Sequence, residues 1–317
     1  MKKNMVIVSG DYTPKQVEQL ERDFDTIFIE NLEKLLEIPL SDRERIKGIA
    51  FKGHKPLEFS SKQLDLVPNL GIISNFGVGF DGIDINEATT RGIKVTNTPG
   101  VLTDDVADLA IGMLIALSRQ FLMGVDWIKS GNWKKFGEMP LNRTISSQKA
   151  GVLGLGRIGR AIAQRLSAFS MEIHYYSRSK KPDAMDWKYH SDPVALAAEV
   201  DFLFVALVGG EETNKLVSSQ VITALGSDGI LVNISRGSTV DEDALLLALQ
   251  SGSIRGAALD VFAGEPNINL KFFDLDNVFL QPHQGSGTIE SREAMSKLQR
   301  DNLSNFFNNM DLITPVN

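Results

Sequence analysis

Short apolar runs alternate with segments of helical period along the first hundred residues. Five runs predict buried parallel strands bounded by turn residues: Met5–Val8, Thr26–Ile29, Gly48–Phe51, Ile72–Asn75 and Lys94–Asn97. Thr13-Pro14 predicts the start of a helix between the first two strands, with one apolar face formed by Val17, Leu20 and Phe24. This alternation is typical of an α/β domain with its own core.

A second series of the same kind follows a long apolar helix. Pro99-Gly100 ends the first series, and we expect Thr103 to cap that helix. Residues Lys129–Gln148 form a polar segment that we predict to be irregular. Six further strands are predicted: Ala150–Leu155, Glu172–Tyr176, Asp201–Leu207, Ile230–Ile234, Ala257–Val261 and Val278–Gln281. Six strands with helices between them match the two mononucleotide halves of a dinucleotide-binding fold.

The last segment of helical period, Ile289 to Phe307, follows the final predicted strand, and we expect it to pack on the first domain. The fold class is therefore α/β with two doubly wound parallel sheets. We predict a discontinuous, flavodoxin-like substrate-binding domain over residues 1–99 and 288–317. A Rossmann dinucleotide-binding domain is predicted over residues 100–287.

Composition narrows the class of protein. The 317 residues include 33 basic and 40 acidic side chains, a net charge of -7, which argues against a nucleic-acid partner. There is no cysteine, which excludes disulfides, thiol nucleophiles and zinc–thiolate sites, and we predict no metal site. The apolar run near Met1 is too short for a signal peptide, and no run approaches the ~18 apolar residues of a membrane span. We expect a cytoplasmic protein.

The most informative segment is Gly154-Leu155-Gly156-Arg157-Ile158-Gly159, which lies between a predicted strand and a predicted helix. In that context G-x-G-x-x-G presents backbone N–H groups and a helix N-terminus to a pyrophosphate. A structural glycine turn is the alternative.

The residues after the next strand indicate which coenzyme binds. An NAD site normally has an acidic residue about 20 positions beyond the glycines. Here the strand ends in Ser177-Arg178-Ser179-Lys180-Lys181, whose hydroxyls and guanidinium suit a 2′-phosphate. We therefore predict NADP(H) as the preferred coenzyme, with NAD(H) possible as well. A solvated basic loop is the alternative.

Three polar residues follow successive predicted strands of the second series. Arg236 supplies a cation for a carboxylate. His283 supplies a proton donor, and Glu265 supplies a partner for its imidazole. Reduction of a 2-oxo acid needs these three functions. Taken singly, Arg236 suits a surface ion pair, Glu265 a loop end and His283 a core position. We assign structural roles to His54, His174 and His190, which lack such neighbours in the sequence.

The chain resembles the D-isomer-specific 2-hydroxyacid dehydrogenases over nearly its whole length, especially the NADPH-using glyoxylate/hydroxypyruvate and hydroxyphenylpyruvate reductases. The resemblance rests on Gly77-Val78-Gly79-Phe80-Asp81, Gly154–Gly159, Ile234-Ser235-Arg236-Gly237, Ala258-Leu259-Asp260-Val261-Phe262, Glu265-Pro266 and Pro282-His283-Gln284-Gly285-Ser286. Two positions depart from the family pattern: Gly287 replaces an alanine, and Val208–Thr213 replaces a loop rich in leucine and proline.

The resemblance implies roles for single residues. His283 would protonate the carbonyl oxygen, Glu265 would fix the tautomer of its imidazole, and Arg236 would clamp the substrate carboxylate. The amides of Val78 and Gly79 would hold the same carboxylate. Further coenzyme contacts are implied for Thr103, Thr213, Ile234, Ser235, Asp260 and Gly285.

The substrate side is less defined by the sequence. Lys52 could help to bind an anionic substrate. Trp133, Phe136 and Met139 either line the substrate pocket across a dimer interface or pack as an ordinary arm. A homodimer is what the resemblance suggests.

We therefore predict an NADPH-dependent reductase of small 2-oxo acids such as glyoxylate, hydroxypyruvate or an aryl pyruvate. A reductase of 2-ketogluconate and a nicotinamide-binding sensor or corepressor are the alternatives.

Overall fold

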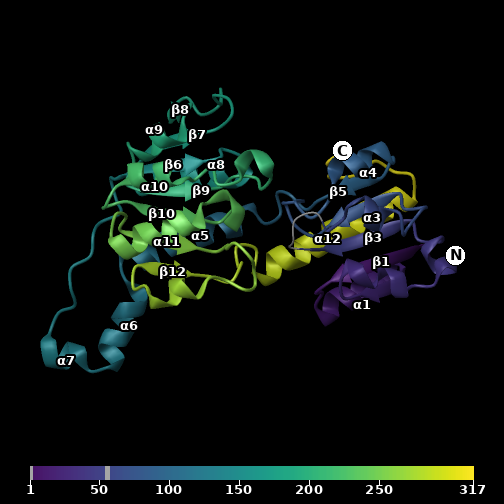
Figure 1. Ribbon diagram of the computed structural model, residues 1–317, viewed down its shortest axis with the longest axis horizontal. Helices are drawn as coiled ribbons and strands as arrows, with labels where there is room; N and C mark the ends of the chain where they lie inside the picture. Colours follow the sequence, from purple (N-terminus) through teal and green to yellow (C-terminus); the bar gives the residue numbers. More distant parts are fainter. Residues whose placement is uncertain (1–2, 54–57) are drawn as a thin grey trace. The chain divides into compact units, whose positions relative to one another are not determined.

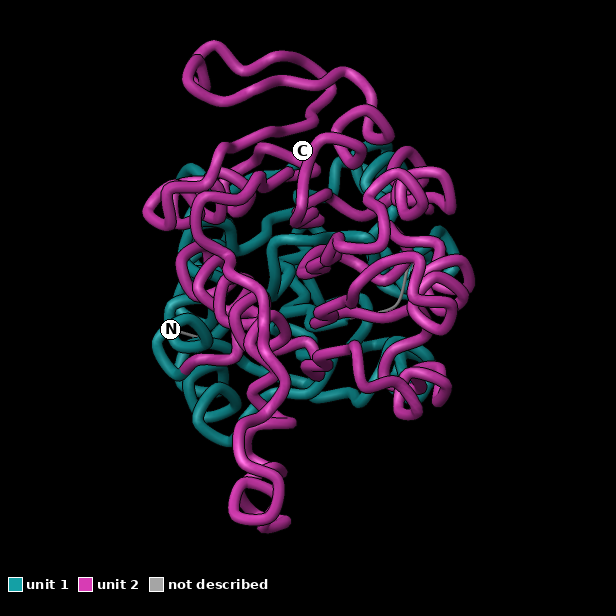
Figure 2. The backbone as a smooth tube through the Cα atoms, turned by 90° about the vertical axis from the view of Figure 1, so that its left-hand side faces the viewer, with its two compact units in different colours: residues 1–102, 289–317 teal, residues 103–288 magenta. Residues whose placement is uncertain are grey.

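The computed structural model describes residues 3–53 and 58–317 (Figure 1). The chain forms two compact units, which Figure 2 distinguishes by colour. Unit 1 contains residues 1–102 and 289–317, and unit 2 contains residues 103–288. Each unit is built on a parallel sheet with helices between its strands, which confirms the predicted fold class.

Within the described residues, unit 1 has a five-stranded parallel sheet in the order β2-β1-β3-β4-β5. Its strands are β1 (Met5–Gly10), β2 (Asp25–Ile29), β3 (Gly48–Lys52), β4 (Ile72–Asn75) and β5 (Lys94–Thr96). All five apolar runs are thus confirmed as strands. Its short helices are α1 (Pro14–Asp23), η1 (Leu32–Glu37), α2 (Leu40–Arg43), α3 (Ser61–Leu64) and α4 (Ile85–Thr90). Thr13 caps α1, and Gln16 completes the capping box, so the proline-led helix is confirmed as well.

The long helix α12 (Ile289–Phe307) packs against α1, β3 and β4 of unit 1. Leu303 is fully buried in one core with Val6 and Val8. The buried Gln299 donates its Nε2 hydrogens to the carbonyl oxygens of Ser74 and Phe51, at 2.8 and 3.3 Å. These buried hydrogen bonds tie α12 to β3 and β4.

Unit 2 has a seven-stranded parallel sheet in the order β12-β11-β10-β9-β6-β7-β8. In Figure 1 this order runs from β12 near the bottom to β8 at the top. The strands are β6 (Lys149–Leu153), β7 (Glu172–Tyr176), β8 (Lys188–His190), β9 (Phe202–Val205), β10 (Ile230–Asn233), β11 (Gly256–Leu259) and β12 (Val278–Leu280). The sequence predicted six of them and missed β8, because three residues with a polar start carry too little alternation to indicate a strand.

The helices of unit 2 begin with α5 (Thr103–Ser118), of which Thr103 is the first residue rather than the preceding cap. The others are α6 (Phe121–Lys129), α7 (Asn132–Phe136), α8 (Arg157–Ser167), α9 (Pro193–Ala197), η2 (Glu211–Thr213), α10 (Ser219–Leu225), η3 (Gly237–Thr239), α11 (Glu242–Ser251) and η4 (Leu270–Asp274). In the described part of the chain no single helix is long and apolar enough to cross a membrane, although α5 and α6, bent by 51°, meet that test as a pair.

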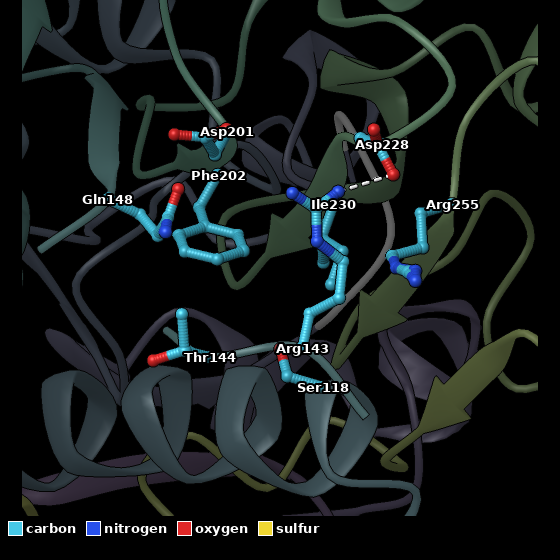
Figure 3. A pocket seen from close by; sticks show the side chains of 9 residues that line it. All are labelled: Ser118, Arg143, Thr144, Gln148, Asp201, Phe202, Asp228, Ile230 and Arg255. Atoms are coloured by element: carbon cyan, nitrogen blue, oxygen red, sulfur yellow. Dashed lines mark ion pairs between the residues drawn. The ribbon is translucent and has the colours of Figure 1, made fainter. Parts of the chain in front are cut away.

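Helices α6 and α7 project from the body of unit 2 (Figure 1). The prediction that residues 129–148 are irregular is therefore wrong for α7. The chain returns from this arm at Arg143, which forms an ion pair with Asp228. Figure 3 shows this pair beside a cavity of about 20 Å³, large enough for about one water molecule. Gln148 and Asp201, which precede β6 and β9, place the cavity at the amino ends of the strands.

Candidate active site

The glycine-rich turn follows β6, the strand at which the sheet order reverses. Gly154 has φ +96°, and a Cβ there would lie 2.6 Å from the carbonyl oxygen of Ala206. A Cβ on Gly159 would lie 2.0 Å from the carbonyl oxygen of Gly154. A Cβ on Gly156 would meet nothing within 4 Å, so space remains in front of α8, which begins at Arg157. This open cradle at a helix N-terminus fits the pyrophosphate of a dinucleotide.

The loop after β7 carries hydroxyl and cationic groups where an NAD site has a carboxylate. Arg178 is 90% exposed, and its Nη1 lies 3.5 Å from Oε2 of Glu212. Ser177 Oγ donates to the carbonyl of Ser179 at 2.7 Å. Asp183, the nearest acid along the chain, pairs with Arg160 at 2.9 Å. The loop therefore fits a ribose that carries a 2′-phosphate.

Arg236 follows β10 in a turn that buried polar groups hold. Asn233 Nδ2 and Thr239 Oγ1 both donate to the carbonyl oxygen of Arg236, at 3.1 and 2.7 Å. Asn233 Oδ1 accepts from the backbone N–H and the hydroxyl of Ser235, at 3.0 and 2.9 Å. A Cβ on Gly237 would lie 1.9 Å from a backbone carbon of Phe262, so the turns after β10 and β11 touch. Arg236 is thereby fixed at the carboxyl end of its strand.

Glu265 and His283 form a direct pair after β11 and β12. Glu265 Oε2 lies 2.7 Å from Nδ1 of His283, and Oε1 accepts the backbone N–H of Phe262 at 2.8 Å. Burial opposes the charge on Glu265, but the hydrogen bond from His283, the backbone bond and nearby Arg236 together lower the pKa of this carboxyl. An ionised carboxylate only accepts, so the proton sits on Nδ1 of His283, and Nε2 is the ring nitrogen that Glu265 does not engage.

Asp260 holds the loop that carries His283. Its two carboxylate oxygens accept the backbone N–H groups of Gln284 and Gly285, at 2.6 and 2.8 Å. Its own carbonyl accepts the N–H of His283 at 2.8 Å. Asp260 is 1% exposed, and burial raises its pKa despite these bonds. They hold His283 at φ +54°, a left-handed conformation that is uncommon for a residue with a side chain.

The structure brings the three predicted catalytic residues and the glycine turn to one edge of one sheet. Strands β12, β11 and β10 are neighbours, and all pairings in this sheet are parallel. Their carboxyl ends therefore meet at the edge where the glycine turn leaves β6.

Other predicted coenzyme residues lie in unit 2. Ile234 and Ser235 are buried in the turn after β10. Thr213 closes its own loop by donating to the carbonyl oxygen of Val208 at 2.6 Å. Thr103 starts α5, and Gly285 lies in the His283 loop.

The predicted substrate contacts Val78, Gly79 and Lys52 belong to unit 1. Asn97 donates to the carbonyl of Val78, and Asn75 donates to that of Gly79. The Lys52 ammonium bonds the carbonyl of Asp11. It lies 5.4 and 5.6 Å from the ring centroids of Phe76 and Tyr12. Burial, with the charge of Arg292, lowers the pKa of Lys52.

Several polar contacts in unit 2 have little or no signal in the sequence. Asn233 shapes the Arg236 turn, and its position two residues before a serine at a strand end is the only sequence signal for that role. Glu242 accepts the N–H of Ala263 and thereby supports the Glu265 loop. His174 and His190, for which the sequence predicts structural roles, bond one another, and His174 also bonds Glu172. His54 lies outside the described residues.

The sequence and the fold are similar to those of known proteins. Residues 111–285 match the family described as D-isomer specific 2-hydroxyacid dehydrogenase, NAD binding domain. The glyoxylate/hydroxypyruvate reductase A HPR2 of Arabidopsis thaliana is 50% identical over 250 residues, 79% of each chain. The 2-ketogluconate reductase of Gluconobacter oxydans is 41% identical over 311 residues, 98% of each chain.

A crystal structure of the NADPH-dependent glyoxylate/hydroxypyruvate reductase of Sinorhizobium meliloti, in complex with NADP and malonate, superimposes with a TM-score of 0.92. It is 41% identical to this chain, and the alignment covers 99% of this chain and 97% of that one.

Proposed function

Because the chain belongs to the D-isomer specific 2-hydroxyacid dehydrogenases, we propose that it reduces small 2-oxo acids to D-2-hydroxy acids with NADPH. One observation carries the proposal: Glu265 orients His283 at 2.7 Å on the sheet edge that also presents Arg236 and the glycine turn. Relatives named as glyoxylate/hydroxypyruvate reductases support this substrate class.

The residues of unit 2 have separate roles in the proposed reaction. NADPH, when bound on the glycine turn and the Ser177–Ser179 loop, supplies the hydride that reduces the carbonyl carbon. Arg236 pairs with the substrate carboxylate and polarises the carbonyl. His283 delivers the proton from Nε2 to the carbonyl oxygen, and Glu265 stabilises the imidazolium form that precedes this transfer. Carboxylate binding by the Val78 and Gly79 amides and by Lys52 remains a prediction.

We propose a homodimer built through the arm. Helix α6 has no buried residue, and Phe121, Leu122, Val125 and Ile128 are all exposed on it. Trp133 and Phe136 are 62% and 61% exposed, which supports coverage by a second copy over packing within one chain. We propose that the protein is located in the cytoplasm.

The test is NADPH oxidation followed at the nicotinamide absorbance with glyoxylate, hydroxypyruvate, hydroxyphenylpyruvate and 2-ketogluconate. We expect turnover with at least one of the first three, and none with His283→Ala. Turnover with 2-ketogluconate alone would favour the second candidate, which the relative matched over 98% of the chain supports. NADPH binding with no turnover on any acid would refute the enzyme and favour a sensor.

A further inference from the structure

A cluster of histidine and glutamate side chains lies at the β8 edge of the unit 2 sheet, on elements that carry none of the catalytic residues. His174 lies on β7, His190 ends β8, and Glu199 follows α9. His174 is fully buried and His190 nearly so, whereas the Glu199 side chain is 44% exposed. The proposed reaction uses none of these groups.

The three side chains of the cluster bring ligand atoms close to one another. His174 Nδ1 lies 3.0 Å from His190 Nε2. A ring nitrogen of each histidine and a carboxylate oxygen of Glu199 all lie within 4.8 Å of one another. In the β7–β8 register His174 faces Lys188 and His190 faces Tyr176, so the two histidines are diagonal neighbours. Two metal-bound nitrogens at 2.0–2.1 Å from an ion are separated by roughly 3 Å, so the imidazoles already stand near a binding distance.

A second carboxylate prepares His174 for this role. Glu172 Oε1 lies 2.8 Å from His174 Nε2, which must be the protonated nitrogen because a carboxylate only accepts. His174 therefore turns the lone pair of Nδ1 toward His190. A metal-binding histidine usually donates its other ring N–H to a carboxylate or carbonyl, and this is the arrangement of His174 and Glu172.

We propose that His174 Nδ1, His190 Nε2 and the Glu199 carboxylate bind one divalent transition-metal ion, with Zn²⁺ as the type case and Glu172 as a positioning residue. Two imidazoles and one carboxylate are a ligand set that Zn²⁺, Co²⁺ and Ni²⁺ accept. On binding, the proton that His190 Nε2 donates to His174 moves to His190 Nδ1 through solvent, so the ring stays neutral. The Lys188 ammonium, 2.5 Å from Glu199 Oε2, leaves that carboxylate.

The site would fasten a short edge strand. β8 has three residues and pairs with β7 alone, while Tyr189 Oη donates to the carbonyl of Ser177 at 3.4 Å. A metal ion joining β7, β8 and the residue after α9 would therefore stiffen the support of the coenzyme loop without touching it.

The experiment uses the full chain after treatment with a chelator. We expect equilibrium dialysis to show one Zn²⁺ per chain, and Co²⁺ to give the visible absorption of a site with nitrogen and oxygen ligands. His190→Ala and Glu199→Gln each remove a direct ligand and should weaken Co²⁺ binding at least 100-fold. Glu172→Gln should weaken it about 10-fold, the size of effect seen for outer partners of metal ligands. Lys188→Ala should tighten binding, because it removes the competitor for Glu199.

Two controls separate this site from other acceptors. His283→Ala removes the only described histidine outside the cluster and should leave the stoichiometry at one. Asp186→Asn changes an exposed acid just before β8 and should leave the affinity unchanged. Failure of the wild type to bind Co²⁺ or Zn²⁺, or equal affinity in wild type, Glu199→Gln and Lys188→Ala, would overturn the proposal; Lys188→Ala keeps the test valid if His190→Ala does not fold.

Discussion

His283 reaches its orientation through three separate contacts: the Glu265 carboxylate at Nδ1, the Asp260 carbonyl at its backbone N–H, and the Asp260 carboxylate on the two following residues. The sequence predicts the Glu265 contact through the family resemblance. It cannot predict the Asp260 contact, because a buried carboxylate that binds two backbone N–H groups depends on the path of a loop 24 residues away.

Replacing Glu265 by glutamine tests the orienting carboxylate. Glu265→Gln keeps the shape but removes the charge that stabilises the imidazolium, so kcat should fall about 100-fold, while the Kd for NADPH stays unchanged. Steady-state kinetics and fluorescence titration measure the two quantities. An equal loss in both would contradict the assigned role.

Because its pKa is lowered, Glu265 stays ionised above pH 5, so its own protonation should not reduce the wild-type rate between pH 5 and 8.

The coenzyme preference depends on Arg178. Arg178→Ala should weaken NADPH about 10- to 100-fold, the effect of losing a charge-assisted hydrogen bond to phosphate, and NADH far less. Glu212→Gln should tighten NADPH, because it removes the carboxylate that lies 3.5 Å from the guanidinium. Paired NADPH and NADH titrations measure both effects, and an unchanged preference in Arg178→Ala would refute the phosphate interpretation.

At the scale of elements, the hydrophobic pattern predicts the strands and the long helices. The strands are continuous apolar runs because parallel sheets are buried on both faces, and the helices show apolar residues at helical spacing. Helix α12 ends at the residues that the sequence predicts. The pattern fails for β8 and α7, which have three and five residues, too few to show a period.

Two glycines of the G-x-G-x-x-G motif should behave differently. Gly159→Ala places a methyl group 2.0 Å from the Gly154 carbonyl, so α8 must move from β6, with a loss of about 2 kcal/mol in the free energy of unfolding. Gly156→Ala has open space and a normal φ of -81°, so stability should hold while NADPH binding is lost to the methyl in the phosphate cradle. Denaturant unfolding and NADPH titration compare the two variants; matching losses of stability would contradict this account.

An ion pair fastens α12 to α1. Arg300 is largely buried, and its Nη1 lies 2.5 Å from Asp23 Oδ2. Burial opposes the charge on Asp23, but hydrogen bonds from Arg22 and Arg300 outweigh it and lower the pKa. Asp23→Asn should therefore cost about 2 kcal/mol at pH 7, below the full value for a completely buried pair.

The pH dependence follows from the direction of that shift. Because folding lowers the pKa of Asp23, its ionised carboxylate contributes stability at pH values above the ordinary pKa of 3.8. This contribution is lost as the pH falls through the lower pKa of the folded protein. The stability gap between wild type and Asp23→Asn should thus be constant near neutrality and shrink below pH 3.8. Urea unfolding over a pH series measures it. The exposed Asp25→Asn serves as the control, and a gap that grows in acid would show the sign to be wrong.

At the scale of the whole molecule, the sequence predicts two units, because the hydrophobic pattern shows two series of strands and a final helix after the second series. The sequence could not predict what covers the arm, because only the fold shows which apolar side chains remain exposed outside the core.

Leu122→Glu with Ile128→Glu should convert the proposed dimer to a monomer of 34.9 kDa. Light scattering after gel filtration measures the mass, with Leu247→Glu, equally exposed on α11, as the control. Dimer mass in the double variant would remove the arm from the interface.

The interleaving of the two units bears on how the protein is made. The sheet of unit 1 is translated first, but Leu303 and Gln299, which cover its buried strands, are translated only after all of unit 2. On the ribosome, the coenzyme-binding half can therefore complete its core while the segment that preceded it still exposes an apolar face. The nascent chain must keep that face from aggregating until α12 emerges, so chaperone dependence should be concentrated in the first hundred residues.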